Sequence, residues 1–199
     1  MEYAGQDLAH SLSKEWPNSD DIYDYMKQIA NGILILNKFG IVHRDLKIQN
    51  IILSYENNDI NDETNYKMKE NIKLIDFGFS TILTCHERTN ESYGTLCYIS
   101  PEMINNEYYN HKIDVWTLGI IGYLLLNHKF PFFDNSFMDC TESQKFEIIS
   151  KNISEKNVYL DENLFDVPKK KKLAKIVNMC LVKDIEKRAN INQILSIFN

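Results

Sequence analysis

The sequence is poor in the features that mark several large classes of protein. Its four cysteines form no Cys-x-x-Cys pair and its five histidines no cluster at metal-ligand spacing, so neither a disulfide framework nor a zinc site is expected. The most apolar stretch, residues 116–126, falls short of the roughly 18 to 20 residues of a membrane span and is expected to be a buried helix. Basic residues are not in excess, with 22 against 28 acidic ones. We therefore expect reduced thiols in a cytoplasmic protein that binds neither a membrane nor nucleic acid.

The overall composition of the chain is typical of a folded domain. The 199 residues are 44% hydrophobic and 25% charged, as in ordinary soluble globular proteins. A chain of this length buries about 70% of the surface of its unfolded form, so it can hold a core without cross-links. No internal repeat and no domain boundary is visible, and we treat residues 1–199 as one unit.

Hydrophobic periodicity predicts a mainly helical chain. Apolar residues recur at helical spacing from residues 19–20, which are good N-caps, until Gly40 stops the pattern. Two short β-rich runs, 51–55 and 72–75, are typical of a hairpin. The polar, asparagine-rich residues 56–71 between them have the composition of a solvated insertion. Further helices are predicted at 114–127, 141–152, 169–181 and 190–198.

Two short motifs concentrate the chemistry of the chain. Residues 43–50 read His-Arg-Asp-Leu-Lys-Ile-Gln-Asn and residues 76–78 read Asp-Phe-Gly, which resembles the catalytic loop and the metal-binding motif of protein kinases. Later segments resemble further kinase motifs in the same order, namely GTLCYISPE at 94–102, DVWTLG beginning at Asp114, Pro131-Phe132 and DIEKR at 184–188. The resemblance covers essentially the whole chain. It implies a protein kinase-like fold, here the mainly α C-terminal lobe with a small β hairpin.

The resemblance implies a role for each polar residue of the catalytic loop. A phosphoryl group in transfer needs its charge neutralised and its attacking and leaving oxygens in line, so carboxylates, metal ions and cations are required at fixed positions. Asp45 is expected to orient the substrate hydroxyl and accept its proton, and Lys47 to reach the transferring phosphate. Asn50 and Asp76 offer oxygen ligands suited to Mg²⁺. ATP and Mg²⁺ are therefore the expected cofactors, and a loop of solvated surface charges is the alternative.

The substrate class is implied by a threonine in the activation segment. Thr95, together with Lys47, resembles the serine/threonine-directed branch of the family. The expected substrates are proteins that present Ser or Thr acceptors. The surrounding segment is most similar to aurora-like and polo-like kinases.

Other motif residues have supporting roles by resemblance. His43 is expected to stack beneath Phe77, next to Gly78, as part of an apolar spine. Glu102 and Arg188 resemble a buried ion pair that fixes the segment after the activation loop. For His43 a packed structural role is expected rather than a catalytic one.

Arg44 resembles the arginine that receives an activation-segment phosphate, which implies regulation by phosphorylation. Thr89 and Ser92 are the candidate phosphate acceptors. Glu91 stands where many relatives carry a phosphothreonine. Its carboxylate is therefore an alternative partner that pairs with Arg44 without modification.

The opening residues, MEYAGQDL, read as the end of a strand running into a connection and resemble the kinase hinge. By that resemblance the Glu2 carbonyl and the Ala4 amide face adenine. Asp7 then faces the ribose, and Ile52 packs under the adenine ring. The 199 residues contain no glycine-rich loop and no V-A-I-K lysine. The N-terminal β lobe is therefore expected to be missing.

Two functions remain open at this point. The first is a truncated serine/threonine protein kinase catalytic region, with little activity on its own. The alternative is a non-catalytic scaffold or binding module made of the C-terminal lobe. A cytoplasmic location is expected. The four lysines at 169–172 could also form a nuclear-localisation patch, although a solvated helix start explains that run more simply.

Overall fold

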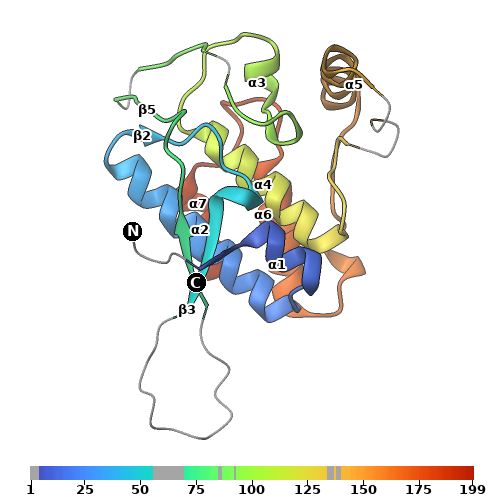
Figure 1. The fold of residues 1–199 in the computed structure, drawn as a ribbon. Helices are drawn as coiled ribbons and strands as arrows, with labels where there is room; N and C mark the ends of the chain where they lie inside the picture. The colour runs from blue at the N-terminus through green and yellow to red at the C-terminus, as the bar shows by residue number, and fades with distance from the viewer. Residues whose placement is uncertain (1–4, 56–69, 85–86, 92, 134–136, 138–139) are drawn as a thin grey trace, which may run out of the picture.

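The computed structural model describes residues 5–55, 70–84, 87–91, 93–133, 137 and 140–199. Within these ranges the chain is mostly helical with few strands (Figure 1), as the sequence predicts. The helices are α1 (Leu8–Lys14), α2 (Ser19–Lys38), α3 (Pro101–Ile104), α4 (Lys112–Asn127), α5 (Glu142–Glu155), α6 (Pro168–Cys180) and α7 (Ile191–Phe198). Glu2, Ala4 and Ser92 lie outside the described residues, as do residues 56–69 of the predicted insertion.

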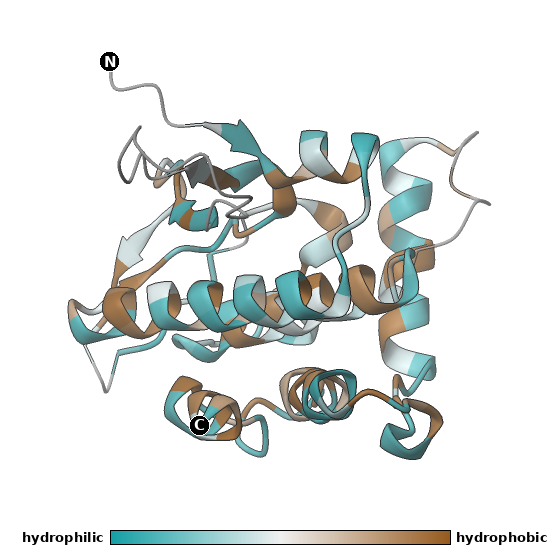
Figure 2. Cartoon of the chain, turned by 90° about the horizontal axis from the view of Figure 1, so that it is seen from below, coloured by the Kyte–Doolittle hydropathy of each residue, from teal (hydrophilic) through white to brown (hydrophobic). Residues whose placement is uncertain are grey.

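The long helix α2 is confirmed and ends just before Gly40, but its N-cap is Asn18 and not Ser19 or Asp20 as predicted. The Asn18 side chain caps it by accepting hydrogen bonds from the backbone N–H groups of Asp20 and Asp21, at 2.8 and 3.1 Å. Most of its apolar residues fall on one face and are buried, while Ile35 is exposed, and Figure 2 shows hydrophilic and hydrophobic residues alternating along the helix. The chain leaves α2 through Gly40, whose φ of +70° is open mainly to glycine.

Helix α4 is apolar on nearly all sides and runs through the core. It begins two residues before the predicted start, at Lys112, and packs against α2 and α6. Trp116 is fully buried, and its indole N–H donates to the Ile99 carbonyl at 3.0 Å. The helix ends at His128, whose N–H donates to the Leu124 carbonyl from a left-handed backbone conformation. The prediction of a buried helix in this region is confirmed.

The described strands form two small antiparallel sheets. The predicted hairpin is confirmed as β3 (Ile51–Tyr55) paired with β4 (Glu70–Leu74), and β1 (Gln6–Asp7) pairs with the other edge of β3. The second sheet joins β2 (Ile41–Val42) to β5 (Thr81–Ile82). Together these pairings place the loop after β2 and the loop after β4 on the same side of α2 (Figure 1).

Helix α1 follows directly after the first strand, where the sequence predicts only a connection and no helix. The Asp7 carboxylate caps α1 by accepting the His10 N–H at 2.9 Å, and Leu8 is fully buried. A seven-residue helix is too short to show clear periodicity, which is why it is missed.

The C-terminal helices agree with prediction within a few residues. Helix α5 stands apart at the edge of the molecule in Figure 1. The four-lysine run opens α6, where Lys169 forms an ion pair with Asp20 at 2.9 Å and lies 5.4 Å from the centre of the Tyr23 ring. Of the helices in the described ranges, none combines the length and the apolar character needed to cross a bilayer.

Candidate active site

The loop at 43–50 is anchored to the core by a buried carboxylate. Asp114, in the first turn of α4, accepts the backbone N–H groups of His43 and Arg44 at 2.8 and 3.1 Å. Burial raises the pKa of the Asp114 carboxyl, while these N–H donors and nearby His43 act in the opposite direction. Arg44 has a φ of +68°, a strained conformation for a side chain of its size. The two hydrogen bonds hold the backbone in that conformation and fix the direction in which the next residue points.

That next residue, Asp45, forms a triangle with a lysine and a threonine. The Lys47 Nζ lies 2.7 Å from Asp45 Oδ2 and 3.1 Å from Thr95 Oγ1, and the Thr95 hydroxyl donates to Asp45 Oδ1 at 2.9 Å. Asp45 is 3% exposed. Both carboxylate oxygens therefore have fixed partners, and a cation lies at the mouth of the site.

Asn50 closes the loop behind Asp45. Its amide donates to the Asp45 carbonyl at 2.8 Å and lies 3.3 Å from Asp45 Oδ2, and the residue is buried. Both contacts use the amide nitrogen, so the nitrogen is turned toward the loop. Gly94 approaches from the activation segment with φ +109°, and a Cβ there would lie 2.6 Å from the Arg44 carbonyl oxygen. Only glycine fits this approach, which brings Thr95 next to Asp45.

The Asp-Phe-Gly motif lies just after β4. Asp76 is exposed and has a φ of +63°, and its carboxylate accepts the Gly78 N–H at 3.3 Å. The ring centres of His43 and Phe77 are 5.0 Å apart, and His43 Nε2 lies 3.1 Å from the Ile75 carbonyl oxygen. The structure thus brings His43 and Phe77 together and joins the two motifs.

The donor set fits Mg²⁺ better than a metal that requires a full protein cage. Within the described ranges, no group of three or more His, Cys, Asp or Glu side chains could hold a metal ion. Mg²⁺ does not need one, because it binds through one or two protein oxygens together with phosphates and water. Asn50 and Asp76, one from each motif, offer such oxygens.

Arg44 is the centre of a second cluster. Its guanidinium nitrogens lie 2.9 Å from a Glu91 carboxylate oxygen and 3.4 Å from the Tyr109 hydroxyl, and its Nε donates to the Phe79 carbonyl. The guanidinium carbon lies 4.6 Å from the centre of the Tyr93 ring. Burial lowers the pKa of Arg44, but the hydrogen bonds with Tyr109 and Glu91 outweigh it and raise the pKa. Tyr93 and Tyr109 are missed by the sequence analysis because no motif contains them.

The candidate phosphate acceptor Thr89 lies at the start of the same cluster. Its backbone exchanges two hydrogen bonds with Tyr109, at 3.2 and 2.9 Å, and its hydroxyl accepts the Glu91 N–H at 3.3 Å. The structure therefore brings Arg44, Glu91 and Thr89 together. The other candidate acceptor, Ser92, lies outside the described residues.

The carboxylate of Glu102 and the guanidinium of Arg188 form a buried bidentate pair. Their nitrogen–oxygen distances are 2.6 and 2.8 Å across 86 residues of sequence. Arg188 also donates to the carbonyls of Val182 and Lys112, and its guanidinium lies 5.0 Å from the centre of the Trp116 ring. The pair joins α3 to the segment before α7.

Two expected nucleotide-binding residues are neighbours. Asp7 and Ile52 face each other in the β1–β3 register, and Ile52 is 7% exposed. The Asp7 carboxylate is engaged as the cap of α1. Glu2 and Ala4, which are expected beside adenine, lie outside the described residues.

Comparison with known proteins agrees with this geometry. A family model described as protein kinase domain matches residues 1–197. An Aurora kinase of Saccharomyces cerevisiae is 38% identical over 134 residues, which is 66% of this chain and 33% of that protein. Calcium-dependent protein kinase 4 of Plasmodium berghei is 34% identical over 86% of the chain and 28% of that protein. Human myosin light chain kinase 2 is 30% identical over 88% of the chain and 26% of that protein. The matches span about a quarter to a third of the length of these relatives.

Proposed function

The chain belongs to the protein kinase domain family, and from that membership we propose that it is the catalytic region of a serine/threonine protein kinase. It transfers the γ-phosphate of ATP to a Ser or Thr of a protein substrate. The observation that carries the proposal is the triangle of Asp45, Lys47 and Thr95. It combines a buried carboxylate, a cation and a hydroxyl in the arrangement that phosphoryl transfer requires.

Asp45 acts on the substrate hydroxyl. Because Thr95 and Lys47 hold its two oxygens, the carboxylate cannot rotate freely, and a hydroxyl beside it is oriented before its proton is taken. Lys47 is 22% exposed and places positive charge next to the same point, where a phosphate gains negative charge in the transition state. Mg²⁺–ATP supplies the phosphoryl group and divalent charge, and Asn50 and Asp76 would hold the metal.

The serine/threonine class is supported by Thr95 and by the relatives. A threonine bonded to both Asp45 and Lys47 resembles the Ser/Thr-directed branch of the family. The relatives, an Aurora kinase, a calcium-dependent protein kinase and a myosin light chain kinase, are each named as kinases. Protein substrates with Ser or Thr acceptors are therefore proposed as the partners.

We further propose that the 199 residues alone transfer little phosphate. In protein kinases a glycine-rich loop covers the phosphates, and a lysine–glutamate pair outside this sequence must be in place for transfer. Losing a single preorganised donor to the transition state lowers a rate by about 10² to 10³. An N-terminal lobe is thus the partner that the site needs.

Glu91 is proposed to take the place of an activation-segment phosphate. The Arg44 guanidinium already has an anion at 2.9 Å, a tyrosine hydroxyl and a backbone carbonyl around it. A phosphate on Thr89 would have to displace the Glu91 carboxylate or share the guanidinium with it. On this proposal Glu91 keeps its place beside Arg44 without phosphorylation of Thr89.

The experiment is a chimera with a matched inactive control. The N-terminal lobe of the yeast Aurora relative is fused ahead of this chain, and transfer from Mg²⁺–ATP to a Ser/Thr peptide mixture is measured with Asp45 and with Asp45→Asn. We expect transfer by the chimera only when Asp45 is intact, and little by the unfused chain. If a folded, ATP-binding chimera is no more active than its Asp45→Asn form, catalysis is ruled out in favour of a scaffold. Equal activity of the unfused chain would overturn the need for an N-terminal lobe.

A further inference from the structure

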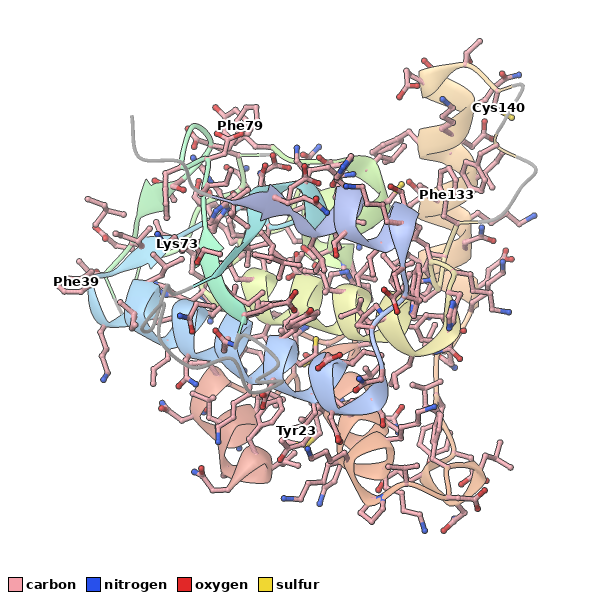
Figure 3. The ribbon with its side chains drawn as sticks, turned by 60° about the horizontal axis from the view of Figure 1, so that its bottom comes forward. Tyr23, Phe39, Lys73, Phe79, Phe133 and Cys140 are labelled. Carbon is pink, nitrogen blue, oxygen red and sulfur yellow. The ribbon has the colours of Figure 1, made fainter. Side chains whose placement is uncertain are left out.

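The widest of the described cavities is an apolar groove beside the catalytic loop. It has a volume of about 460 Å³ and lies between α1, the C-terminal end of α4 and the turn that follows α4. In Figure 3, Phe133 of that turn lies beside α1. The side chains that make the groove apolar are Leu12, Trp16, Ile48, Leu124, Phe130 and Phe133.

The groove is continuous with the site through one residue. Ile48 lines the groove and belongs to the loop that carries Asp45 and Lys47. Three residues of chain span at most about 11 Å, so the part of the groove that Ile48 lines lies within about that distance of Asp45. A polypeptide whose hydroxyl lies at Asp45 reaches the groove about three residues from that hydroxyl.

The groove is connected to the active site by packing contacts of Tyr98. Tyr98, three residues after Thr95, packs edge-on against Phe130 with ring centres 5.3 Å apart. Its hydroxyl oxygen lies 3.5 Å from the backbone nitrogen of Ile48. The position of the groove relative to Asp45 is therefore held by core packing.

The ionisable side chains among the described residues that line the groove are basic. Among the described residues that line it, none is acidic, while His128 and Lys129 carry basic groups. His128 stacks on Trp16 with ring centres 4.2 Å apart. A segment lying in the groove gains by burying an apolar side chain and gains nothing from an added basic residue.

We infer that this groove binds the substrate polypeptide on one side of the acceptor Ser or Thr, and that it selects a large apolar residue, such as Leu or Phe, about three residues from the acceptor. The inference rests on the proposed function and narrows its substrate class. Acidic residues beside the apolar one are compatible with the basic rim, and a basic residue at the apolar position is disfavoured.

The test measures binding and does not require phosphate transfer. The ligands are short peptides with a central Ser in a neutral polar background, in which each flanking position in turn carries Leu, Phe, Arg or Ala. Trp16 lies in the groove and Trp116 is fully buried, so a change in tryptophan fluorescence on peptide addition reports on the groove.

We expect the Leu or Phe peptide with the residue about three positions from Ser to bind about ten-fold more tightly than the Ala peptide, the effect of partly burying a large apolar side chain. The Arg peptide is expected to bind no better than the Ala peptide. Equal binding by all peptides, or tightest binding by an Arg peptide, would overturn the inference.

Two groove variants and one control locate the site. Leu12→Lys and Ser13→Phe should each abolish the preference, the first by charge and the second by filling the groove from an exposed position. Ile35→Lys changes an exposed apolar residue of α2 that does not line the groove, so this variant should retain the preference for the apolar peptides. Because Leu12 also packs on the core, its variant is compared only if it unfolds cooperatively. If Ser13→Phe still prefers the Leu or Phe peptide, the peptide binds outside the groove.

The outcome is independent of catalysis. The peptide measurement uses no ATP and no phosphate transfer, so it can be read whether or not the chain is active. An active chimera without the apolar preference would refute the groove and leave the kinase proposal intact. Apolar binding, together with a folded, ATP-binding chimera that is no more active than its Asp45→Asn form, would refute the kinase proposal and leave the groove as a peptide site.

Discussion

The carboxylate of Glu91 lies 2.9 Å from a guanidinium nitrogen of Arg44, whose side chain is only 6% exposed. Arg44 directly precedes Asp45, and Glu91 lies in the activation segment. The pair therefore ties the position of that segment to the residue proposed as the catalytic base. Because the glutamate is part of the chain, its ion pair with Arg44 is permanent, whereas a phosphate is added and removed.

The first prediction concerns this pair. Glu91→Gln should lower the free energy of unfolding by about 1 kcal/mol, because the half-exposed carboxylate is partly screened by water while the buried guanidinium loses its anion. Glu186→Gln is the matched control, since Glu186 pairs with Arg88 at 2.7 Å where both side chains are well exposed. It should change the free energy by less than about 0.5 kcal/mol. Urea unfolding of both variants measures the difference, and equal effects would contradict a special role for Glu91.

A second prediction follows for phosphorylation. If Glu91 serves as the permanent anion, Thr89→Ala should leave hydrogen exchange in residues 79–91 nearly unchanged, whereas Glu91→Gln should speed it. The Thr89 hydroxyl makes only a 3.3 Å contact with the Glu91 N–H, so its loss costs little. Faster exchange in Thr89→Ala than in Glu91→Gln would favour Thr89 as the switch.

The buried pair of Glu102 and Arg188 gives a third prediction. Arg188→Met should lower the free energy of unfolding by about 3 to 5 kcal/mol, because it leaves a buried carboxylate without a partner. Adding Glu102→Gln to Arg188→Met should recover part of that loss, since the unpaired charge is removed. Denaturant unfolding of the two single variants and the double variant completes the cycle. Purely additive losses would show that the two side chains do not stabilise each other.

A fourth prediction tests the anchor of the catalytic loop. Asp114→Asn keeps the size of the side chain but presents an NH₂ group to one of the two backbone N–H donors that the carboxylate accepts. Leaving one buried donor unpaired should cost about 1 to 3 kcal/mol. Asp161→Asn is the control, because the Asp161 carboxylate caps the short 3-10 helix Glu162–Leu164 at a less buried position, and it should cost about 1 kcal/mol or less. Circular dichroism during urea unfolding checks both.

The long elements could be predicted from sequence because their patterns repeat several times. Helix α2 carries its apolar face over 20 residues, and β3 and β4 are five residues each. The short elements could not. The strands β2 and β5 are two residues each, so no period can appear, and they exist because the loops around them are held by the core.

In the candidate site, too, some contacts could be predicted from the sequence and others could not. The contacts of Asp45 with Lys47 and Thr95 could be expected from the motifs, since motif order carries long-range information. The ring of Tyr93 and the hydroxyl of Tyr109 around Arg44 could not, because neither residue belongs to a motif and both arrive by folding of the activation segment. The groove depends on side chains from distant parts of the chain and leaves no local signal.

The last prediction concerns the hydroxyl that links the base to the lysine. In the active chimera, Thr95→Val removes a hydrogen bond to the Asp45 carboxylate and one from the Lys47 ammonium, and keeps the shape of the side chain. Hydrogen bonds to charged groups are worth about 1.5 to 3 kcal/mol, so kcat should fall by about ten-fold to a hundred-fold.

Thr95→Ser keeps the hydroxyl and should retain most of the rate, which separates loss of the hydrogen bonds from loss of packing. The KM for ATP should not change in either variant, because Thr95 contacts the base and the lysine and not the proposed metal ligands. Steady-state kinetics of the three chimeras decide the matter. A Val variant as fast as the Ser variant would mean that Lys47 and Asn50 suffice to hold the Asp45 carboxylate, since those are its other side-chain partners in the described part of the chain.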